Sequence, residues 1–206
     1  MGISGDNQSV TFFETQFQRQ VSENEFVLNP FEELALDYLQ GEVLDLGAGL
    51  GNLSLEAGRR GHRVLAVEAS PTAVTRINLA AREAGLPVAA IQENIGQWRI
   101  DRAYDTIVAI GLLMFFERAT ALNLLREIQN NVKPGGIAVI NTLVKGTTFM
   151  DMFDPDNYYL FTTRELEQLF SGWTILKSVE QSFPAAAGTV KKFSTVIAKN
   201  NTKSAV

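Results

Sequence analysis

The stretch Glu42-Val-Leu-Asp-Leu-Gly-Ala-Gly-Leu-Gly51 decides the fold of this chain. Its apolar, β-rich part from Val43 to Leu46 is typical of a short strand buried in a parallel sheet. The alternate glycines that follow permit a tight turn into a helix, because glycine adopts backbone conformations that other residues avoid. The backbone of such a turn can lie directly against a ligand, so the stretch predicts a binding site at the end of the strand.

A carboxylate stands at the end of the next predicted strand. Val64 to Val67 form a second β-rich run, which ends at Glu68, seventeen residues after Gly51. A carboxylate at the carboxyl edge of a parallel sheet is well placed to accept hydrogen bonds from both hydroxyls of a ribose. The glycine turn followed by this carboxylate therefore predicts a site for a small cofactor that carries adenosine.

The glycine spacing separates two classes of adenosine cofactor. A dinucleotide site usually has the pattern G-x-G-x-x-G, whereas this chain has G-x-G-x-G from Gly47 and carries Asn52 at the position of the last dinucleotide glycine. Asp45, two residues before the first glycine, would repel a diphosphate and attract an ammonium or sulfonium group. These residues favour S-adenosylmethionine; a nicotinamide-dependent oxidoreductase is the weaker alternative.

Length and composition limit the class of protein. The chain has 206 residues, enough for one α/β domain with a substantial core. Its net charge of −5 disfavours nucleic acid and anionic membranes as partners, and no apolar run approaches the roughly 20 residues that cross a bilayer. There is no cysteine, which excludes disulfides and thiolate sites, and we expect no metal site. We therefore expect a cytoplasmic protein that acts on a small molecule; its oligomeric state is left open.

Strand and helix patterns alternate from residue 42 onward. Strands are predicted at residues 42–47, 63–68, 88–93, 105–110 and 137–143, followed by β-rich runs at 173–183 and 191–199. The last two runs have no helix between them and should pair as an antiparallel hairpin. The pattern predicts an α/β fold with a Rossmann-like seven-stranded sheet, mostly parallel with an antiparallel last strand, and helices on both faces.

A single domain is expected over residues 1–206. Residues 41–199 should form its core. Residues 11–40, which include several phenylalanines and a helix opened by Pro30, precede the sheet as a helical segment that can act as a lid. The polar ends, residues 1–10 and 200–206, are expected to be mobile.

The glycine turn, Glu68 and the terminal hairpin together resemble class I S-adenosylmethionine-dependent methyltransferases, over roughly residues 30–199. Three further motifs resemble the small tellurite-resistance methyltransferase family: Gly111-Leu-Leu-Met-Phe-Phe-Glu117, Lys133-Pro-Gly-Gly136 and Gly172-Trp173. Some members of that family carry a His-Arg pair in the last hairpin, at the acceptor site. This chain offers only Lys191 and Lys192 there, which we interpret as a solvated strand end, so the resemblance implies methyl transfer more firmly than a particular acceptor.

The resemblance also implies which residues hold the cofactor. They are Asp45, Gly47, Ala48, Gly49, Asn52, Glu68, Ala69, Asn94, Ile95, Ile110 and Gly111. Many relatives have Asp where this chain has Asn94, whose amide carbonyl can still accept a hydrogen bond from the adenine amino group. The alternatives are that Asn94 caps its own loop and that Asp45 caps a helix.

The methyl acceptor is expected to bind beside the loop after the fourth strand. The expected acceptor-binding residues are Phe13, Phe17, Leu112, Phe115, Tyr158 and Tyr159. The last two belong to an unusually aromatic insertion at residues 145–161, whose phenylalanines and methionines suit an apolar or polarisable acceptor. Packing in the core is the alternative role for these aromatic side chains.

No catalytic residue is identified in the sequence. Methyl transfer is an in-line displacement in which positioning lowers the barrier, so no protein nucleophile is needed. A hydroxyl or a protonated amine would also need a base, but the only histidine, His62, is predicted to lie at the amino edge of the second strand. This favours a soft or ionised acceptor, such as a thiol or a selenium or tellurium oxyanion. A noncatalytic cofactor-binding or partner subunit is the alternative.

Overall fold

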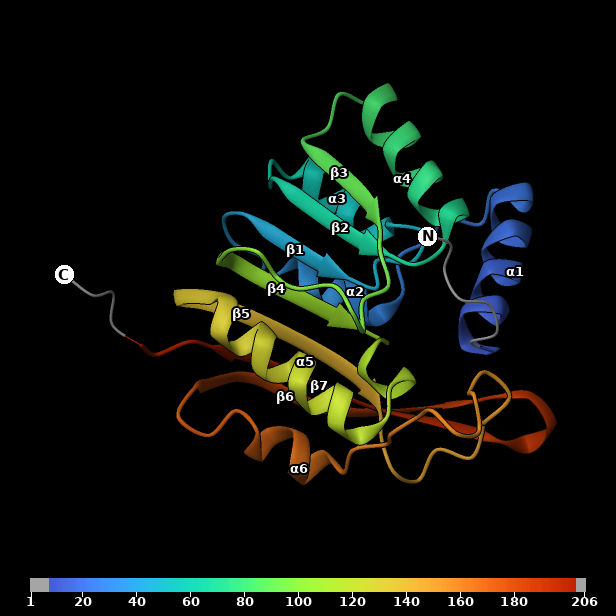
Figure 1. The fold of residues 1–206 in the computed structure, drawn as a ribbon, viewed down its shortest axis with the longest axis vertical. Helices are drawn as coiled ribbons and strands as arrows, with labels where there is room; N and C mark the ends of the chain where they lie inside the picture. Colours follow the sequence, from blue (N-terminus) through green and yellow to red (C-terminus); the bar gives the residue numbers. More distant parts are fainter. Residues whose placement is uncertain (1–7, 203–206) are drawn as a thin grey trace.

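The computed structural model describes residues 8–202, which form one seven-stranded sheet in the order β3-β2-β1-β4-β5-β7-β6 (Figure 1). The strands are β1 (Val43–Leu46), β2 (Val64–Glu68), β3 (Val88–Gln92), β4 (Tyr104–Ile110), β5 (Val132–Leu143), β6 (Thr174–Pro184) and β7 (Val190–Lys199). The first five strands pair in parallel, whereas β7 is antiparallel to both β5 and β6. The predicted Rossmann-like sheet with an antiparallel terminal hairpin is confirmed.

Helices cover both faces of this sheet. One face carries α2 (Pro30–Leu36), α3 (Asn52–Arg59) and α4 (Pro71–Glu83), and the other carries α5 (Arg118–Asn131) and α6 (Thr163–Gln168). The short helices η1 (Leu113–Phe115) and η2 (Ala186–Gly188) lie in connecting loops. The remaining helix, α1 (Gln8–Glu23), stands at the carboxyl edge of the sheet and contacts α4 (Figure 1). None of the described helices is long and apolar enough to span a membrane.

Side chains fix where the helices begin. Ser70 Oγ accepts a hydrogen bond from the Ala73 N–H at 3.0 Å, and Thr162 forms a capping box with Glu165. A third N-cap, Asn29, forms a capping box with Glu32 at the start of α2. Each cap satisfies backbone N–H groups that lack a partner inside the helix. Glu32 is therefore held at a defined position beside the sheet.

The core lies between the sheet and its helices. Strand β1 is buried along its whole length, as expected for the apolar run that predicted it. On one face Leu44 and Ile107 pack with Leu125 of α5, and all three are at most 1% exposed. Burying each such side chain contributes about 1.5–3 kcal/mol, so the packing holds β1 and β4 rigidly beneath the site.

Strand β5 begins at Val132, earlier than the predicted start at residue 137. Its pairing with β4 shifts from Tyr104↔Val132 to Thr106↔Ile137, so the Lys133-Pro-Gly-Gly136 motif forms an irregular bulge inside the strand. A Cβ atom at Gly136 would lie 2.7 Å from the Asp105 carbonyl oxygen, so the bulge needs glycine there.

The chain ends are described only in part. Residues 1–7 and 203–206, which belong to the ends expected to be mobile, lie outside the described residues. Residues 8–10 begin α1, and Asn200 is buried and donates from Nδ2 to the Val132 carbonyl at 2.8 Å.

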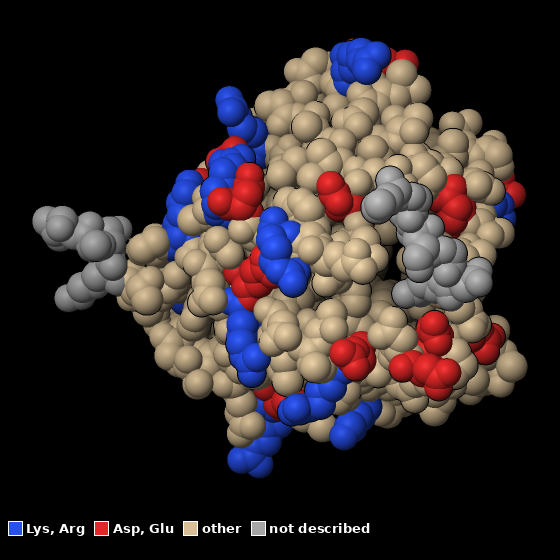
Figure 2. Space-filling model, in the orientation of Figure 1, with Lys and Arg blue, Asp and Glu red and all other residues tan. Residues whose placement is uncertain are grey.

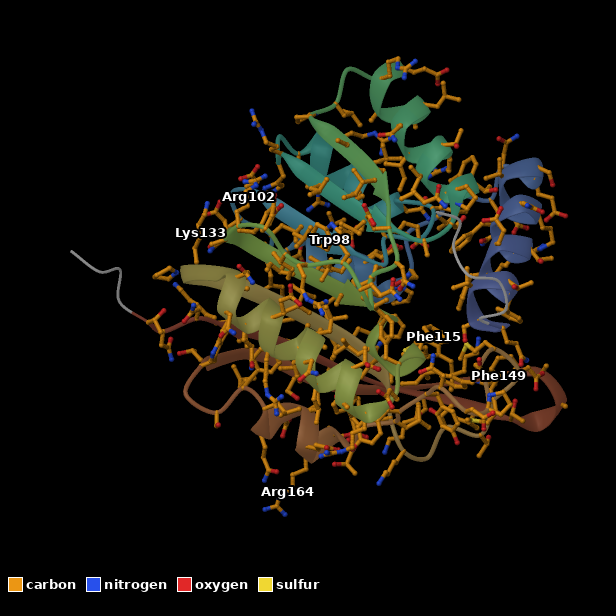
Figure 3. All side chains as sticks on the ribbon, viewed as in Figure 1. Trp98, Arg102, Phe115, Lys133, Phe149 and Arg164 are labelled. Carbon is orange, nitrogen blue, oxygen red and sulfur yellow. The ribbon has the colours of Figure 1, made fainter. Side chains whose placement is uncertain are left out.

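Basic and acidic side chains are interspersed on one face of the molecule, and an aromatic side chain lies at the carboxyl edge of the sheet. Basic side chains on the face in Figure 2 lie beside acidic ones. Arg102 forms an ion pair with Glu42, and Lys133 forms one with Asp105. Figure 3 shows Arg102 and Lys133 at the amino edge and Phe115 toward the carboxyl edge. Phe115 thus contributes apolar surface at the carboxyl edge, as suits a ligand cavity.

Candidate active site

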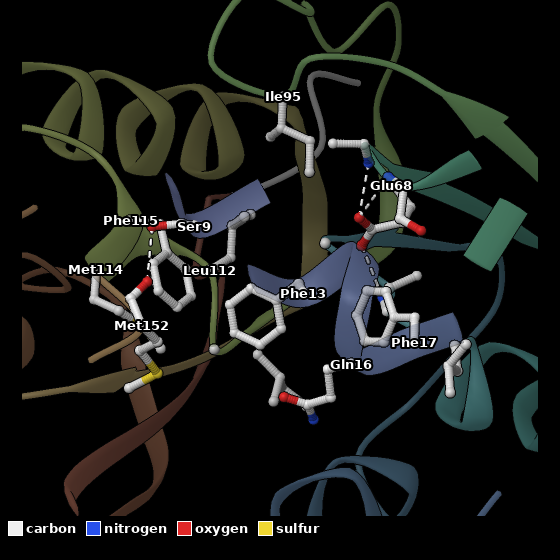
Figure 4. A pocket seen from close by; sticks show the side chains of 18 of the residues that line it. Ser9, Phe13, Gln16, Phe17, Glu68, Ile95, Leu112, Met114, Phe115 and Met152 are labelled. Atoms are coloured by element: carbon white, nitrogen blue, oxygen red, sulfur yellow. Dashed lines mark hydrogen bonds between the residues drawn. The ribbon is translucent and has the colours of Figure 1, made fainter. Parts of the chain in front are cut away.

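A cavity of about 570 Å³ lies at the carboxyl edge of the sheet, a size typical of small-ligand sites. Its floor and walls come from the ends of β1, β2, β4, β5 and β7 and from the start of α2. One face of α1 covers it, through Ser9, Val10, Thr11, Phe13, Gln16, Phe17 and Gln20 (Figure 4). These positions recur at helical spacing, so the helix presents a continuous surface to the cavity.

The glycine turn and Glu68 meet on one wall. Gly47 and Gly49 have φ of 69° and 53°, in the region that favours glycine. The Gly49 N–H donates to Glu68 Oε2 at 2.9 Å, while the N–H groups of Ala69 and Ser70 donate to Oε1 at 2.8 and 3.0 Å. Burial raises the pKa of the Glu68 carboxyl, and these three backbone hydrogen bonds oppose that shift.

A second buried carboxylate, Asp45, lies behind the turn. It is 3% exposed, and its Oδ2 accepts a hydrogen bond of 2.7 Å from Ser54 Oγ in α3. Burial raises the pKa of Asp45 to about 6; the Ser54 hydroxyl opposes this shift, and the charge of Glu68 adds to it. Two neighbouring buried carboxylates favour a cationic ligand, whose charge relieves their repulsion.

Asn94 and Ile95 follow β3 and line the same cavity. Asn94 Oδ1 accepts a hydrogen bond of 3.1 Å from the Gly96 N–H, so its side chain caps the local loop, one of the two roles the sequence left open. A carbonyl oxygen has two lone pairs, and one remains for a ligand. Ile95 is 5% exposed and supplies an apolar surface suited to a flat ring.

Aromatic and sulfur-containing side chains form the opposite wall. The ring of Phe13 lies 5.8 Å from that of Phe17 and 5.1 Å from that of Phe115, measured between centroids. In Figure 4 Glu68 lies on one side of Phe13, with Met114 and Met152 on the other. This wall is apolar and polarisable, as expected for the acceptor end.

A polar group lies between these walls on the sheet. Asn141 of β5 pairs in register with Ile110 of β4 and Thr195 of β7. Its side chain is fully buried and donates from Nδ2 to Thr195 Oγ1 at 2.9 Å, but Oδ1 has no partner within the described part of the chain. Such a buried, unpartnered acceptor is costly, and it lies where a ligand can reach it.

Most of the predicted site residues lie around this one cavity. The expected cofactor residues among its lining are Asp45, Gly47, Ala48, Gly49, Glu68, Ala69, Asn94, Ile95, Ile110 and Gly111. Four of the expected acceptor residues also line it: Phe13, Phe17, Leu112 and Phe115.

Three expected site residues lie elsewhere. Asn52 opens α3, and its Nδ2 donates to the Val27 carbonyl at 3.0 Å. Tyr158 is 39% exposed and stacks at 5.1 Å from the ring of Phe153. The Tyr159 hydroxyl donates to Glu165 at 2.8 Å, which directs it to the start of α6.

His62 lies at the amino edge before β2, as predicted, and its Nδ1 is 3.0 Å from the Gly41 carbonyl oxygen.

The polar residues of the cavity that sequence reasoning missed include Glu32, Asn141 and Lys191. Lys191, which we interpreted as solvated, lies with Nζ 4.4 Å from the centre of the Phe149 ring, and burial lowers its pKa. Lys192, in contrast, forms an ion pair of 2.7 Å with Glu180. Side chains alternate between the two faces of a strand, so Lys191 lies on the same face of β7 as Phe193, another lining residue. This alternation was the sequence signal that could have placed Lys191 in the cavity.

Comparison with known proteins connects this geometry to a family. Residues 43–136 match the model of a family described as a methyltransferase domain. This segment contains the glycine turn, Glu68 and Asn94. It is a class I S-adenosylmethionine-dependent methyltransferase domain. The match confirms the family that the turn and its following carboxylate indicated.

Individual relatives are similar to this chain over part of their length. The chain is 31% identical to hemagglutinin 1 of Eikenella corrodens over 144 residues, which are 68% of this chain and 46% of that protein. It is 28% identical to ubiquinone biosynthesis O-methyltransferase of Rickettsia conorii over 115 residues, which are 55% of this chain and 38% of that protein. The chain spans about half the length of the curated relatives it matches.

The methyltransferase domain is also similar to TehB of Haemophilus influenzae. TehB, described as a probable S-adenosylmethionine-dependent methyltransferase, is 25% identical over 137 residues, which are 66% of this chain and 47% of TehB. The crystal structure of TehB has a TM-score of 0.75 at 19% identity, covering 93% of this chain and 67% of that one. The structural likeness shows the shared fold, and the sequence match places the chain close to the TehB family.

Proposed function

We propose that this methyltransferase domain binds S-adenosylmethionine in the cavity and transfers its methyl group to a small-molecule acceptor. The observation that carries the proposal is the hydrogen bond between the Gly49 N–H and Glu68 Oε2, at 2.9 Å, on the wall of the cavity. It brings together the turn expected beside the sulfonium and the carboxylate expected at the ribose. A cavity with only one of these features would not distinguish this cofactor from other adenosine compounds.

The chemistry of the cavity residues fits this cofactor. Glu68 accepts three backbone hydrogen bonds, and a carboxylate has about four lone-pair positions, so it retains capacity for a ribose hydroxyl. Asp45 supplies negative charge near the turn. Asn94 offers a carbonyl oxygen to the adenine amino group, and Ile95 offers an apolar surface to the adenine ring. When bound, S-adenosylmethionine supplies an electrophilic methyl group on its sulfonium.

Helix α1 is suited to close the site as a lid. Glu14 accepts hydrogen bonds of 2.5 Å from both Ser70 Oγ and Thr72 Oγ1, at the start of α4. At the other end of α1, Ser9 Oγ donates to the Met152 carbonyl at 2.9 Å. The helix is thereby attached on both sides of the cavity. A closed lid excludes water from the reacting atoms and holds the acceptor in place, which is the main contribution a protein makes to methyl transfer.

A soft or ionised nucleophile, such as a thiol or a selenium or tellurium oxyanion, is the acceptor class we propose. The wall that contains Met114, Met152 and Phe115 supports it, because polarisable side chains pack favourably against large, polarisable atoms. His62 is not available as a base at this site, since it lies at the opposite edge of the sheet. The acceptor therefore has to be reactive by itself or be activated by a residue of the cavity.

The test is a transfer assay with S-adenosylmethionine tritiated on the methyl group. The full chain is incubated with separate small thiols, selenite and tellurite, and label in the product is counted. We expect saturable transfer to at least one of them. Saturable cofactor binding without transfer to any acceptor would instead indicate a noncatalytic cofactor-binding subunit. Saturable binding of a nicotinamide dinucleotide, with none of S-adenosylmethionine, would indicate an oxidoreductase.

A further inference from the structure

Helix α2 places a carboxylate on the wall of the cavity. Phe31 is 7% exposed, and its ring lies 4.6 Å from that of Phe193 and 5.7 Å from that of Phe183, between centroids. These contacts attach the helix to the terminal hairpin, while the capping box with Asn29 fixes its first turn. The next residue, Glu32, is thereby held at the cavity with little freedom to move away.

One oxygen of this carboxylate is left for a ligand. Glu32 Oε2 accepts the Asn29 N–H at 2.8 Å in the capping box, and Oε1 has no hydrogen-bond partner among residues 8–202. Burial raises the pKa of Glu32 to about 7; the charge of Asp45 adds to this shift, and the Asn29 N–H and Arg76 oppose it. A carboxyl group with that affinity for protons exchanges them readily near neutral pH.

Asn141 provides a second acceptor in the same cavity. Its Oδ1 is buried and unpartnered in the described structure, and its Nδ2 is already engaged with Thr195. Only an N–H, O–H or S–H donor satisfies a free carbonyl oxygen, so the cavity is arranged to receive a protonated group. Glu32 lies in α2 and Asn141 lies in β5. Two separate elements therefore each supply a hydrogen-bond acceptor to the same cavity.

The charges of the cavity disfavour an anion. The charged residues that line it in the described part of the chain are Glu32, Asp45, Glu68 and Lys191. Three of these four are carboxylates, which add repulsion to any approaching oxyanion. The single cation among them, Lys191, lies with Nζ 4.4 Å from the centre of the Phe149 ring. A neutral acceptor avoids this repulsion.

We propose that Glu32 and Asn141 form the acceptor subsite, and that the acceptor is a small thiol which arrives protonated and is deprotonated by Glu32. This inference rests on the proposed methyltransferase function and narrows its acceptor class. The sulfur–hydrogen bond breaks, and the proton passes to Glu32 Oε1. The sulfur lone pair forms the new bond to the methyl carbon, while the old carbon–sulfur bond breaks and its electron pair stays on the departing thioether. Asn141 Oδ1 accepts a hydrogen bond from a second donor of the thiol compound, such as the hydroxyl of 2-mercaptoethanol, and so positions it.

Two thiols of different acidity test this step. Tritiated methyl transfer at pH 7 is measured with 2-mercaptoethanol, which is protonated, and with 4-nitrothiophenol, which is already a thiolate. The variant Glu32→Gln keeps the capping-box hydrogen bond, because Gln accepts it equally well, but it cannot take a proton. The matched control is Glu33→Gln, one residue along the same helix on its exposed side.

We expect Glu32→Gln to lower kcat with 2-mercaptoethanol about 100-fold or more. Its kcat with 4-nitrothiophenol and its affinity for S-adenosylmethionine should change less than about threefold, and Glu33→Gln should match the wild type with both thiols. Asn141→Ala should raise KM for 2-mercaptoethanol about tenfold with a smaller change in kcat, as expected from the loss of one hydrogen bond.

Equal activity of Glu32→Gln and wild type toward 2-mercaptoethanol would overturn the inference. So would a wild-type protein that methylates selenite, tellurite or 4-nitrothiophenol but leaves 2-mercaptoethanol unmodified, and in that case the methyltransferase function itself would stand. A protein that binds S-adenosylmethionine and methylates none of these compounds would contradict the proposed function and, with it, this inference.

Discussion

The backbone N–H of Gly49 and the carboxylate of Glu68 are joined by a hydrogen bond of 2.9 Å. The bond connects the loop after β1 to the end of β2, across 19 residues of sequence. It holds the two recognition elements at a set separation. Preorganisation of this kind improves affinity, because little conformational freedom remains to be lost on binding.

Replacing Glu68 by Gln should weaken cofactor binding. The variant removes the negative charge but keeps a side-chain oxygen and nearly the same shape. We expect the affinity for S-adenosylmethionine to fall by about 1.5–3 kcal/mol, the contribution of a hydrogen bond to a charged group. Isothermal titration calorimetry measures this change, and an unaltered dissociation constant would remove Glu68 from the binding site.

Glu68→Ala should also lower stability. In the structure Glu68 Oε1 and Oε2 accept hydrogen bonds from the N–H groups of Gly49, Ala69 and Ser70. Alanine leaves these donors without their partner. We expect a lower melting temperature for Glu68→Ala than for Glu68→Gln in thermal denaturation followed by circular dichroism; equal melting temperatures would show that water replaces the carboxylate at no cost.

Gly51→Ala should destabilise the fold. Gly51 has φ of 74°, and an added Cβ would lie 2.3 Å from Cγ1 of the fully buried Ile77. Backbone strain and overpacking together should cost about 2–4 kcal/mol. Gly61→Ala is the matched control, because Gly61 has φ of 90° but nothing within 4 Å of the new Cβ. Urea unfolding should show the larger loss for Gly51→Ala; equal losses would mean that α4 moves aside freely.

Glu14→Ala should loosen the lid. Loss of the hydrogen bonds to Ser70 and Thr72 detaches α1 from the start of α4, so S-adenosylmethionine should dissociate roughly tenfold faster in stopped-flow measurements. Amides of α1 should also exchange faster with deuterium. Thr15→Ala, on the exposed side of the same helix, should leave both rates unchanged. A dissociation rate for Glu14→Ala equal to wild type would show that α1 does not control access.

Glu32→Gln should change how stability depends on pH. The folded protein raises the pKa of Glu32 from 4.5 to about 7, so it binds the proton more tightly than the unfolded chain. This contribution to stability is full below pH 4.5 and is lost as the pH rises through about 7. The uncharged variant should therefore be more stable than wild type at pH 8, by on the order of 1–2 kcal/mol after allowance for partial exposure, and similar at pH 4.5.

Urea unfolding at the two pH values measures this difference. Asp45, whose pKa is raised to about 6, remains in the variant, so some loss of stability between pH 4 and pH 6 should persist. The same stability difference at pH 4.5 and pH 8 would show that ionisation of Glu32 does not account for it.

The sheet could be predicted because its signals are local. Apolar runs such as Val43–Leu46 mark buried strands, and caps such as Ser70 mark helix starts within a few residues of sequence. The terminal hairpin followed from two β-rich runs without a helix between them. The bulge at the start of β5 was missed, because it depends on how Lys133-Pro-Gly-Gly136 packs against the distant Asp105.

The candidate site was predictable where residues follow a strand directly. Glu68 and Asn94 lie at strand ends, so the sheet alone brings them to the cavity. Tyr159 belongs to a long insertion whose path no local sequence pattern determines. Its hydroxyl donates a hydrogen bond to Glu165 and does not line the cavity. Glu32 was missed because its place in the cavity depends on the packing of Phe31 against the terminal hairpin, far along the sequence.

The central claim is that the cavity beside Gly49 and Glu68 holds S-adenosylmethionine, and calorimetric titration of the full chain with this compound tests it most directly. The account predicts saturable binding of one molecule per chain, lost or strongly weakened in Glu68→Gln, with no saturable heat from a nicotinamide dinucleotide. Absence of binding by S-adenosylmethionine to the folded protein would contradict it.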